Sequence, residues 1–454
     1  MRSLDSLFKP KSIALVGAAH TQEKLGGVIL KNLLSFRGDI YPVNPKYTEL
    51  MGLKAYLSVK EIPKPVDLCI IMRPAPEVPE IIEELKGRVR FAIVMSSGFA
   101  ETGEVALQED VKRIAKETGI RILGPNCMGI YNPHEKLDTF FLPHERLKRP
   151  KKGNVAIVSQ SGAILSCVLG AVRAANTGVS KVAGYGNAID INESDIYEYL
   201  SDDRKTDVIV SYIESVSDGR RFIEKARILS EKKSLLILKS GKGPSGQAAA
   251  FSHTGRLAGR YEVFHSLLRQ FGIMEVMDFD ELMDATKALS YYLSMPPLSK
   301  GGIRGGGNRV CIITNGGGSG VLAADECMRQ GLEVPQLTDV QRERIGRLFP
   351  HFYGINNPVD LTAQVKDEDY ALALNEFKDD YDGFLMIALP NVYGITEGLG
   401  KIMNGAVKEL RKPVVFNVAE GGISKKISAL LEKSKIPVYT SPERAVRGLK
   451  ALLG

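Results

Sequence analysis

Short apolar runs alternate with longer amphipathic stretches along almost the whole chain. Runs of five or six apolar residues fit strands buried on both faces, whereas apolar positions three and four residues apart fit one face of a helix. Their regular alternation indicates parallel β-sheets covered by helices. In the first part of the chain the pattern predicts strands at Ser12–Gly17, Ile40–Val43, Val66–Met72, Phe91–Met95 and Arg121–Leu123, and helices near Glu23–Phe36, Pro76–Lys86 and Glu104–Lys116.

Two breaks in this pattern divide the chain into three. Residues 143–153 are rich in Pro and charge, and residues 295–306 read MPPLSKGGIRGG, which is typical of a linker. We therefore predict an α/β protein of three consecutive parallel-sheet domains, at residues 1–142, 153–295 and 307–454. The later strands are expected at Asn154–Ser159, Asp207–Ile213, Ser234–Lys239, Val310–Thr314, Gly383–Leu389, Pro413–Val418 and Ile436–Tyr439.

The composition indicates which class of protein this is and which kinds of ligand it can bind. The 454 residues are 44% hydrophobic and 25% charged, which is the balance of a globular protein. The net charge is +7, but bases are interspersed with acids, so we expect anionic small molecules and no nucleic acid. Five widely spaced cysteines indicate neither a disulfide framework nor a zinc site. No signal peptide and no long apolar run is present, so we expect a cytoplasmic protein without membrane contact.

Common nucleotide motifs are absent. The first strand ends in Val16-Gly17-Ala18-Ala19-His20, which is not the glycine fingerprint of a dinucleotide site. Asn44 stands where such a site needs an acid, and Lys46 is placed to meet a phosphate, unless these residues only form a turn. No Walker A sequence occurs either. The first domain is therefore expected to bind an anion other than NAD, and any ATP site is expected on a partner chain.

The start of the second predicted domain carries a candidate anion site. Ser159, Gln160, Ser161 and Gly162 follow a strand and open a helix that we expect to run to about Ala175. The amides of a helix's first turn have no partner inside the helix, and they suit an anion such as phosphate. Because Ser is a common helix N-cap in any protein, this pattern alone does not decide between the two functions.

Glu214 and His253 are candidate catalytic residues of the same domain. Glu214 follows the apolar run Val208–Ile213, at the carboxyl end of a strand, where α/β proteins bind ligands. A carboxylate there accepts the Nδ1–H of an imidazole and leaves Nε2 as a nucleophile. His253 lies in Ser240–Gly259, whose glycine content disfavours a helix and predicts a loop. A solvated acid and a bystander histidine are the alternatives, but the three features together favour catalysis.

At these residues the sequence resembles the succinyl-CoA synthetase superfamily, and within it the separate α subunits of the ADP-forming acyl-CoA synthetases. Ser252–Gly259 reads SHTGRLAG, close to the family's phosphohistidine loop. Gly124–Gly129 reads GPNCMG and matches a second family element, while Val158–Gly162 matches its helix-start phosphate site. The resemblance spans the chain and implies a Rossmann-like CoA-binding domain followed by two flavodoxin-like ligase domains.

This resemblance implies a phosphoryl relay. Phosphate attacks acyl-CoA to give acyl phosphate and CoA, and His253 then accepts the phosphoryl group. The group finally passes to ADP, which binds with Mg²⁺ on an ATP-grasp β subunit. The family implies an α2β2 heterotetramer with that subunit.

The resemblance also assigns roles to residues. It implies that Glu214 supports phosphorylated His253 and that Ser159–Gly162 hold phosphate, with Asn126 and Cys127 near the acyl group. The implied CoA contacts, carried by looser motifs, are Gly17, Lys24, Lys46, Arg73 and Ser97. In the third domain Thr314–Gly320 is glycine-rich like a phosphate loop, but the resemblance implies a packing role there.

Two other functions remain open at this point. A CoA-binding regulatory protein would sense acyl-CoA without turnover, and it would not need His253 and Glu214 together. A pyridine-nucleotide dehydrogenase is disfavoured by the broken glycine fingerprint and by Asn44. The sequence does not indicate which acid is used.

Overall fold

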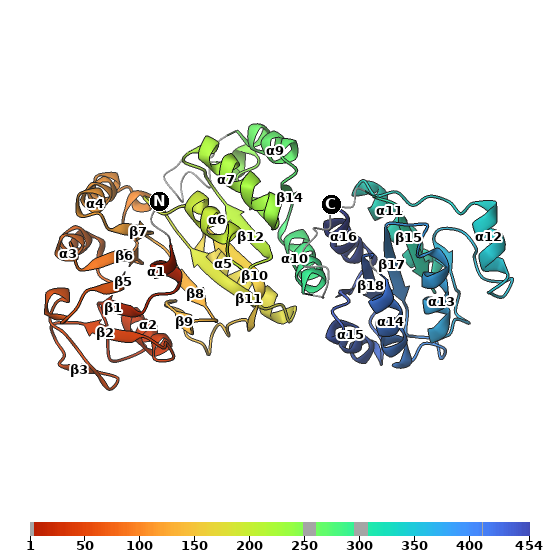
Figure 1. The fold of residues 1–454 in the computed structure, drawn as a ribbon, viewed down its shortest axis with the longest axis horizontal. Coiled ribbons are helices and arrows are strands. Elements are labelled where there is room, and N and C mark those ends of the chain that lie inside the picture. Colours follow the sequence, from red (N-terminus) through yellow and green to blue (C-terminus); the bar gives the residue numbers. More distant parts are fainter. Residues whose placement is uncertain (1–3, 248–259, 295–306, 411) are drawn as a thin grey trace. The chain divides into compact units, whose positions relative to one another are not determined.

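The computed structural model describes residues 4–247, 260–294, 307–410 and 412–454 (Figure 1). The chain divides into two compact units, residues 1–277 and residues 278–454. Each unit is built on mostly parallel β-structure with helices on the sheet faces, which confirms the predicted α/β class.

The first unit begins with a five-stranded parallel sheet in the order β2-β1-β5-β6-β7. Its strands are β1 (Ser12–Val16), β2 (Asp39–Val43), β5 (Val66–Ile71), β6 (Val89–Val94) and β7 (Arg121–Leu123). A small antiparallel hairpin, β3 (Glu49–Leu50) with β4 (Leu53–Lys54), follows β2. The helices are α1 (Asp5–Phe8), α2 (Leu25–Leu33), α3 (Val78–Glu84) and α4 (Val105–Thr118), with 3-10 turns at Val59–Glu61, Ala75–Glu77 and Ala100–Thr102.

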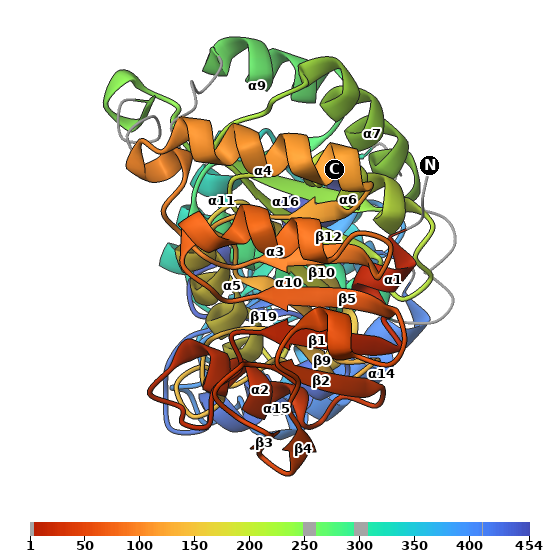
Figure 2. The ribbon, with the colours of Figure 1, turned by 90° about the vertical axis from the view of Figure 1, so that its left-hand side faces the viewer.

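Both faces of this sheet are buried, which explains why its strands are continuous apolar runs. Ile13 and Leu15 face a core shared with α1 and α2, whereas Ala14 and Val16 face the core under α3 and α4. The two helices α3 and α4 lie side by side on that second face (Figure 2). The alternation follows from the two-residue period of a strand.

A seven-stranded sheet forms the rest of the first unit, in the order β14-β13-β12-β10-β11-β8-β9. Strands β14 to β11 in this order are parallel, and the hairpin β8–β9 is antiparallel to β11. Its strands are β8 (Gly129–Asn132), β9 (Leu137–Asp138), β10 (Lys152–Ser159), β11 (Val179–Gly184), β12 (Val208–Ile213), β13 (Ser234–Lys239) and β14 (Met274–Val276). Its helices are α5 (Gly162–Ala174), α6 (Glu193–Ser201), α7 (Gly219–Lys232) and α9 (Tyr261–Gln270).

The hairpin β8–β9 connects the two sheets of this unit. Ile130 and Leu137 from the hairpin lie in the same core as Leu15 of the first sheet and Ile209 of the second. The segment after the hairpin is also fixed, because the amide of Asn32 donates to the carbonyls of Phe140 and Leu142 at 2.8 and 3.1 Å. The sequence pattern did not predict this hairpin, since its strands are short and partly polar.

The second unit contains a five-stranded parallel sheet in the order β16-β15-β17-β18-β19. Helix α10 packs on α16, and Asp284 of α10 is buried against Arg444 of α16. The strands are β15 (Val310–Thr314), β16 (Val359–Asp360), β17 (Gly383–Ala388), β18 (Val414–Val418) and β19 (Val438–Tyr439). The helices are α10 (Phe279–Leu293), α11 (Gly317–Arg329), α12 (Asp339–Gly346), α13 (Asp367–Phe377), α14 (Gly398–Glu409), α15 (Ser424–Lys433) and α16 (Pro442–Leu453).

Most predicted strands occur within one or two residues of their expected bounds. The division at residues 142, 153, 295 and 307 stays a prediction. One local expectation was wrong: residues 244–247 are helical, although the stretch from Ser240 was expected to be a loop. Pro244 occupies the first helical position, where its fixed φ angle and missing N–H cost nothing.

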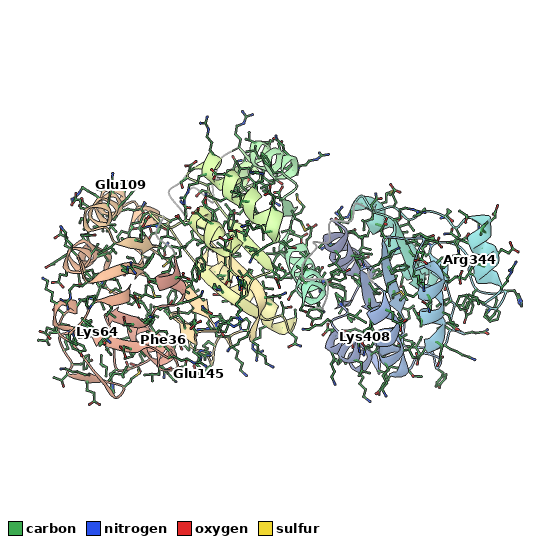
Figure 3. All side chains as sticks on the ribbon, in the orientation of Figure 1. Phe36, Lys64, Glu109, Glu145, Arg344 and Lys408 are labelled. Atoms are coloured by element: carbon green, nitrogen blue, oxygen red, sulfur yellow. The ribbon has the colours of Figure 1, made fainter. Side chains whose placement is uncertain are left out.

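Charged side chains cover the outside of both units, as Figure 3 shows for Lys64 and Glu109 in the first and for Arg344 and Lys408 in the second. Many form exposed ion pairs, such as Lys64 with Asp39 at 2.7 Å, which contribute little to stability. Within the described ranges, none of the helices has the length and hydrophobicity needed to cross a bilayer.

Two helical glycines give a test of this packing. A Cβ atom at Gly26 in α2 would overlap the carbonyl oxygen of Gly17, whereas a Cβ atom at Gly170 in α5 would meet nothing within 4 Å. We expect Gly26→Ala to lower the free energy of unfolding by about 1–3 kcal/mol, because the helix must move away from the turn. Gly170→Ala should raise it by up to about 1 kcal/mol, since Ala is the better helix former. Calorimetric unfolding of both variants measures this, and equal stabilities would contradict the close approach.

Candidate functional site

The five residues expected to contact CoA all lie at the carboxyl edge of the first sheet. Gly17 directly follows β1, and Lys24 directly precedes α2. The other three follow strands within three residues: Lys46 after β2, Arg73 after β5 and Ser97 after β6. This edge is where open α/β sheets bind ligands, because the strand ends and helix starts leave main-chain groups there.

Close main-chain packing shapes this edge. Gly17 has a φ of 90°, and a Cβ atom there would overlap the carbonyl oxygen of Met72. The turn is held from the neighbouring strand by Asn44, whose Nδ2 donates to the carbonyl of Ala18 at 2.7 Å. Lys24, Lys46 and Ser97 are exposed. A turn of glycine and small alanines, bordered by exposed cations, fits a ligand with phosphate groups such as CoA.

The Gly124–Gly129 segment lies beside this edge. Asn126 has a φ of 53°, a left-handed conformation that Asn tolerates better than most residues, and it is half-buried. Its N–H donates to the carbonyl of Ser96 at 2.9 Å, which places it next to Ser97. Cys127 is buried, its Sγ lies 3.3 Å from the carbonyl of Val94, and burial raises the pKa of its thiol to about 12. Asn126 is thus at the surface of the edge, and Cys127 packs beneath it.

The predicted phosphate residues lie at the start of α5 in the second sheet. Ser161 is the N-cap, and its Oγ accepts the N–H of Ile164 at 3.4 Å. The buried hydroxyl of Ser159 donates to the carbonyl of Ser161 at 2.8 Å. Gly162 is the first residue of the helix, so its amide belongs to the first turn, which points toward an anion in many proteins.

Gln160 has a different position from its neighbours. Its Oε1 accepts the N–H groups of Glu214 and Ser215 at 2.9 and 3.1 Å, and its Nε2 donates to the Oγ of Ser215 at 3.1 Å. The side chain therefore joins the end of β10 to the end of β12. It fixes the main chain of Glu214 beside the phosphate residues.

Glu214 and Lys239 form the base of the site. Glu214 is 7% exposed and follows β12, as expected. The Nζ of Lys239, the last residue of β13, donates to the carbonyl of Glu214 at 2.7 Å. The pKa of Lys239 falls from 10.5 to about 8, because burial outweighs the nearby carboxylates of Glu214 and Glu275. The pKa of Tyr212 is raised, mainly by burial and also by the Glu214 carboxylate.

Lys239 did not enter the sequence analysis as a functional residue. The sequence feature that could have identified it is the one used for Glu214: a charged residue at the end of an apolar strand, at the carboxyl edge of the sheet. Only the pairing of β12 with β13 brings the two strand ends together.

Loop contacts join the CoA edge to the phosphate residues. A Cβ atom at Gly162 would lie 3.5 Å from the side chain of Met128, in the Gly124–Gly129 segment. The N–H of Tyr185 donates to the carbonyl of Ser159 at 3.0 Å, and the N–H of Asn187 donates to the carbonyl of Pro125 at 2.9 Å. The carboxyl edges of the two sheets are therefore in contact. His253 and its segment at residues 248–259 lie outside the described residues.

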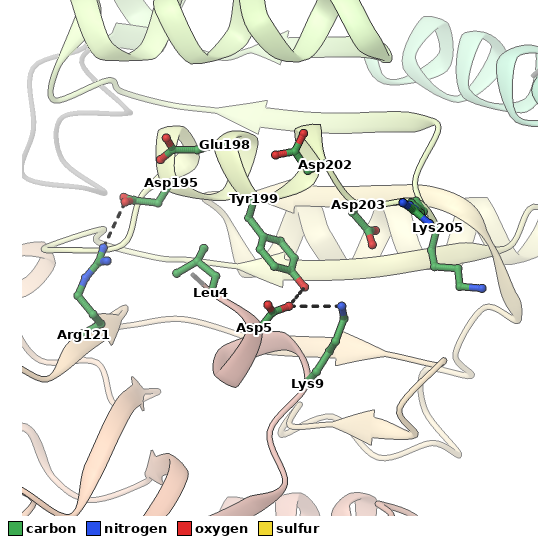
Figure 4. Close-up of a pocket in the computed structure, with 11 residues that line it drawn as sticks. Leu4, Asp5, Lys9, Arg121, Asp195, Glu198, Tyr199, Asp202, Asp203 and Lys205 are labelled. Atoms are coloured by element: carbon green, nitrogen blue, oxygen red, sulfur yellow. Dashed lines mark hydrogen bonds and ion pairs between the residues drawn. The ribbon is translucent and has the colours of Figure 1, made fainter. Parts of the chain in front are cut away.

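Other regions offer weaker candidates. A cavity of about 560 Å³ lies at the opposite end of the strands, next to Arg121 (Figure 4). Its charges pair with one another, for example Arg121 with Asp195 at 3.2 Å and Lys9 with Asp5 at 3.3 Å. The described part of the chain has no cluster of His, Cys, Asp or Glu that fits a metal ion.

The glycine-rich loop of the second unit is a poor anion site. A Cβ atom at Gly317, the first residue of α11, would lie 2.9 Å from Oδ2 of Asp360. A carboxylate next to these amides opposes a second negative charge. Asn315 uses its side chain to bond both main-chain groups of Leu389, at 2.8 and 3.1 Å. These contacts indicate a packing role for the loop.

Comparisons with known proteins agree with this geometry. Three family models match in order: a CoA binding domain at residues 11–133, a succinyl-CoA ligase like flavodoxin domain at 152–289 and a ligase-CoA domain at 310–449. The chain is 38% identical over 465 residues to the alpha subunit of acetate–CoA ligase (ADP-forming) II of Pyrococcus furiosus, covering 99% of this chain and 97% of the relative. The chain belongs to the ADP-forming acetate–CoA ligase family.

Two further comparisons give the extent of the similarity within this family. The chain is 37% identical to the acetate–CoA ligase (ADP-forming) of Methanocaldococcus jannaschii, covering 98% of this chain but 62% of that longer protein. A solved structure of the dinucleotide-forming acetyl-coenzyme A synthetase 1 of Ca. Korarchaeum cryptofilum, in complex with phosphate and ADP, superimposes with a TM-score of 0.89 at 34% identity. That comparison covers 100% of this chain and 96% of the other. The predicted family is confirmed.

The buried amine of Lys239 gives a pH test within this family fold. Its folded pKa of about 8 lies below the ordinary value of 10.5, so the unfolded chain binds more protons between these two values. Wild type should therefore gain stability relative to Lys239→Met as the pH rises through this window, by up to about 3 kcal/mol. Urea unfolding of both proteins from pH 7 to 10.5 measures the difference. A difference in stability that stays constant with pH would show that the pKa of Lys239 is not lowered in the folded protein.

Proposed function

We propose that this chain is the CoA-handling α subunit of an ADP-forming acyl-CoA synthetase, which converts acyl-CoA, ADP and phosphate into the free acid, ATP and CoA. The observation that carries the proposal is the contact between the two carboxyl edges, which joins the CoA edge, Asn126 and the start of α5. Similarity along nearly the full length of a Pyrococcus furiosus alpha subunit supports it. Acetate is the acid named in most of the compared relatives.

The first step of the proposed reaction takes place where the two edges meet. A phosphate oxygen attacks the thioester carbonyl, the C–S bond breaks, and acyl phosphate and CoA are formed. Lys24, Lys46 and Arg73 would hold the phosphates of CoA, with the Gly17 turn against its pyrophosphate. Ser161 and Gly162 would hold the attacking phosphate at the start of α5. Asn126 lies between these groups, beside Ser96 and Met128, so we assign it to the acyl group.

The second step transfers the phosphoryl group to the chain. Nε2 of His253 attacks phosphorus, the P–O bond of acyl phosphate breaks, and the free acid leaves. We assign Glu214 as the acceptor of the Nδ1–H, because a buried carboxylate fixes the tautomer and stabilises the phosphorylated ring. Gln160 and Lys239, which bond the main chain of Glu214, support that position.

The third step requires a partner. We infer an ATP-grasp β subunit that carries ADP with Mg²⁺, in an α2β2 heterotetramer. Similarity to a relative that is named an alpha subunit, 97% of which this chain covers, supports a partner subunit. A cytoplasmic location stays a prediction.

Labelling tests the phosphohistidine. Incubation of the chain with acetyl-CoA and radioactive phosphate should give an acid-labile, base-stable protein phosphate, because this half of the relay needs no nucleotide. His253→Ala should lose the label, and His351→Ala, at an exposed histidine of the second unit, should keep it. Label that persists in His253→Ala would remove the relay. No label in wild type would favour a CoA-sensing protein without turnover.

The assigned role of Glu214 has its own test. Glu214→Gln keeps the shape of the side chain but removes the charge that stabilises the phosphorylated imidazole. We expect the initial rate of labelling to fall about 100-fold, with little change in melting temperature. Glu224→Gln, on the exposed surface of α7, is the matched control and should label like wild type. A rate in Glu214→Gln equal to that of the control would exclude Glu214 from the mechanism.

A further inference from the structure

Asn187 connects three loops at the centre of the site. It lies in the segment after β11 and is 8% exposed. Its Nδ2 donates to Oε2 of Glu101 at 2.6 Å and to Oε1 of Gln108 at 2.9 Å. Its Oδ1 accepts from Nδ2 of Asn126 at 3.4 Å. Three of the four hydrogen-bonding positions of this carboxamide, two donors and one acceptor, are thus defined by neighbours from the first sheet's domain.

Glu101 sets the direction of these hydrogen bonds. Burial raises its pKa, but hydrogen bonds from Asn187, Gly98 and Phe99 outweigh that effect and lower the pKa overall. The side chain is therefore a carboxylate, which only accepts. Asn187 must turn its Nδ2 toward Glu101 and its Oδ1 toward Asn126. Asn126 must in turn present its Nδ2 to Asn187, which leaves its Oδ1 and a second Nδ2 proton for a ligand.

The same carboxylate also holds the turn that follows Ser97. Oε1 of Glu101 accepts the N–H groups of Gly98 and Phe99 at 2.7 and 3.2 Å. One partly buried carboxylate therefore fixes both a turn at the CoA edge and, through Asn187, the side chain assigned to the acyl group. Gly186 permits this arrangement, because any Cβ atom there would overlap the carbonyl oxygen of Asn126.

We propose that Asn187 is a positioning residue for the attack of phosphate on the thioester: oriented by Glu101, it orients the carboxamide of Asn126 at the acyl group. This inference rests on the proposed function. In the chain of hydrogen bonds from Glu101 through Asn187 to Asn126, each residue sets which atom of the next one donates. Exchanging a donor for an acceptor at one residue therefore disturbs the carboxamide of Asn126, which is the group assigned to the substrate. A Gln at position 101 can still accept the N–H groups of Gly98 and Phe99 through its Oε1, which keeps the turn at the CoA edge, so the effect falls on the rate of acyl transfer.

The far end of the same segment provides a structural control. The Nε–H of Arg121 is shared between Oδ1 and Oδ2 of Asp190, at 2.9 Å from each, and Oδ2 also accepts the N–H of Ile122 at 2.8 Å. It anchors the segment to β7 without contacting Asn126. A variant at Asp190 loosens the same loop but leaves the polarity of the Glu101–Asn187–Asn126 chain intact.

Reversal and restoration of polarity test the proposal. Asn187→Asp places two carboxylates 2.6 Å apart, and Glu101→Gln brings an amide against an amide. Each should lower the initial rate of phosphate labelling from acetyl-CoA about 10- to 100-fold, because buried polar groups are left without partners. The double variant Glu101→Gln/Asn187→Asp pairs an amide with a carboxylate again, and it should recover to within about fivefold of wild type. If the Asp variant does not fold, Asn187→Ala takes its place. This variant adds no charge, and its labelling rate should fall about tenfold.

Three measurements separate the outcomes: the labelling rate, the affinity for CoA by calorimetry, and the melting temperature. We expect the Asn187 and Glu101 variants to keep CoA affinity within about threefold, and Asp190→Asn to lose melting temperature but label at the wild-type rate within about twofold. If Asp190→Asn loses as much labelling as Asn187→Ala at equal stability, Asn187 has only a structural role and the inference fails. Single variants that label like wild type overturn it as well. Wild type that takes no label would remove the proposed function itself.

Discussion

The close approach of two loops between the sheets of the first unit is the constraint on which the site depends. The Gly124–Gly129 segment and the segment after β11 touch through main-chain atoms, and Gly186 has no room for a side chain against Asn126. Hydrogen bonds from Asn187 to Pro125 and from Ile189 to Gly124 continue the contact. Because the two sheets meet here at their carboxyl edges, the residues that we propose to bind CoA and those that we propose to bind phosphate become neighbours.

Electrostatics at this junction follow from burial. Lys239 is buried and Glu101 is partly buried, and the charged group of each makes several hydrogen bonds, whereas Glu214 is held through its main chain. A buried charge is costly unless such partners compensate it, so these contacts fix the geometry of the groups as well as stabilising them. The lowered pKa of Lys239 shows that the compensation is incomplete there. Incomplete compensation of this kind is common where a site must remain open to an anionic ligand.

The second unit contributes a fold but no comparable constellation among its described residues. Its glycine loop resembles the phosphate-binding start of α5 in sequence, yet Asp360 lies beside the amides where an anion would bind. The ion pair between Asp284 and Arg444 attaches α10 to α16 of this unit, although α10 precedes the Pro- and Gly-rich stretch at residues 295–306 in the sequence. The same local motif thus has different uses in the two units because neighbouring strands end in different residues.

The sequence by itself determined the α/β class, most of the strands and the residues at their ends, but not β11, β14, β16 or the two hairpins. The features that it determined are local: the two-residue and 3.6-residue periods, the turn residues and the motifs are all readable within short windows. The sequence also placed Gly17, Ser161 and Glu214 at the ends of strands, while Asn126 was assigned only through the family resemblance. Tertiary structure alone decided that the hairpin β8–β9 joins the second sheet and that Lys239 lies under Glu214. It also decided that Glu101 orients Asn187, because such contacts join residues 25 to 86 positions apart and depend on strand order, which no local pattern encodes.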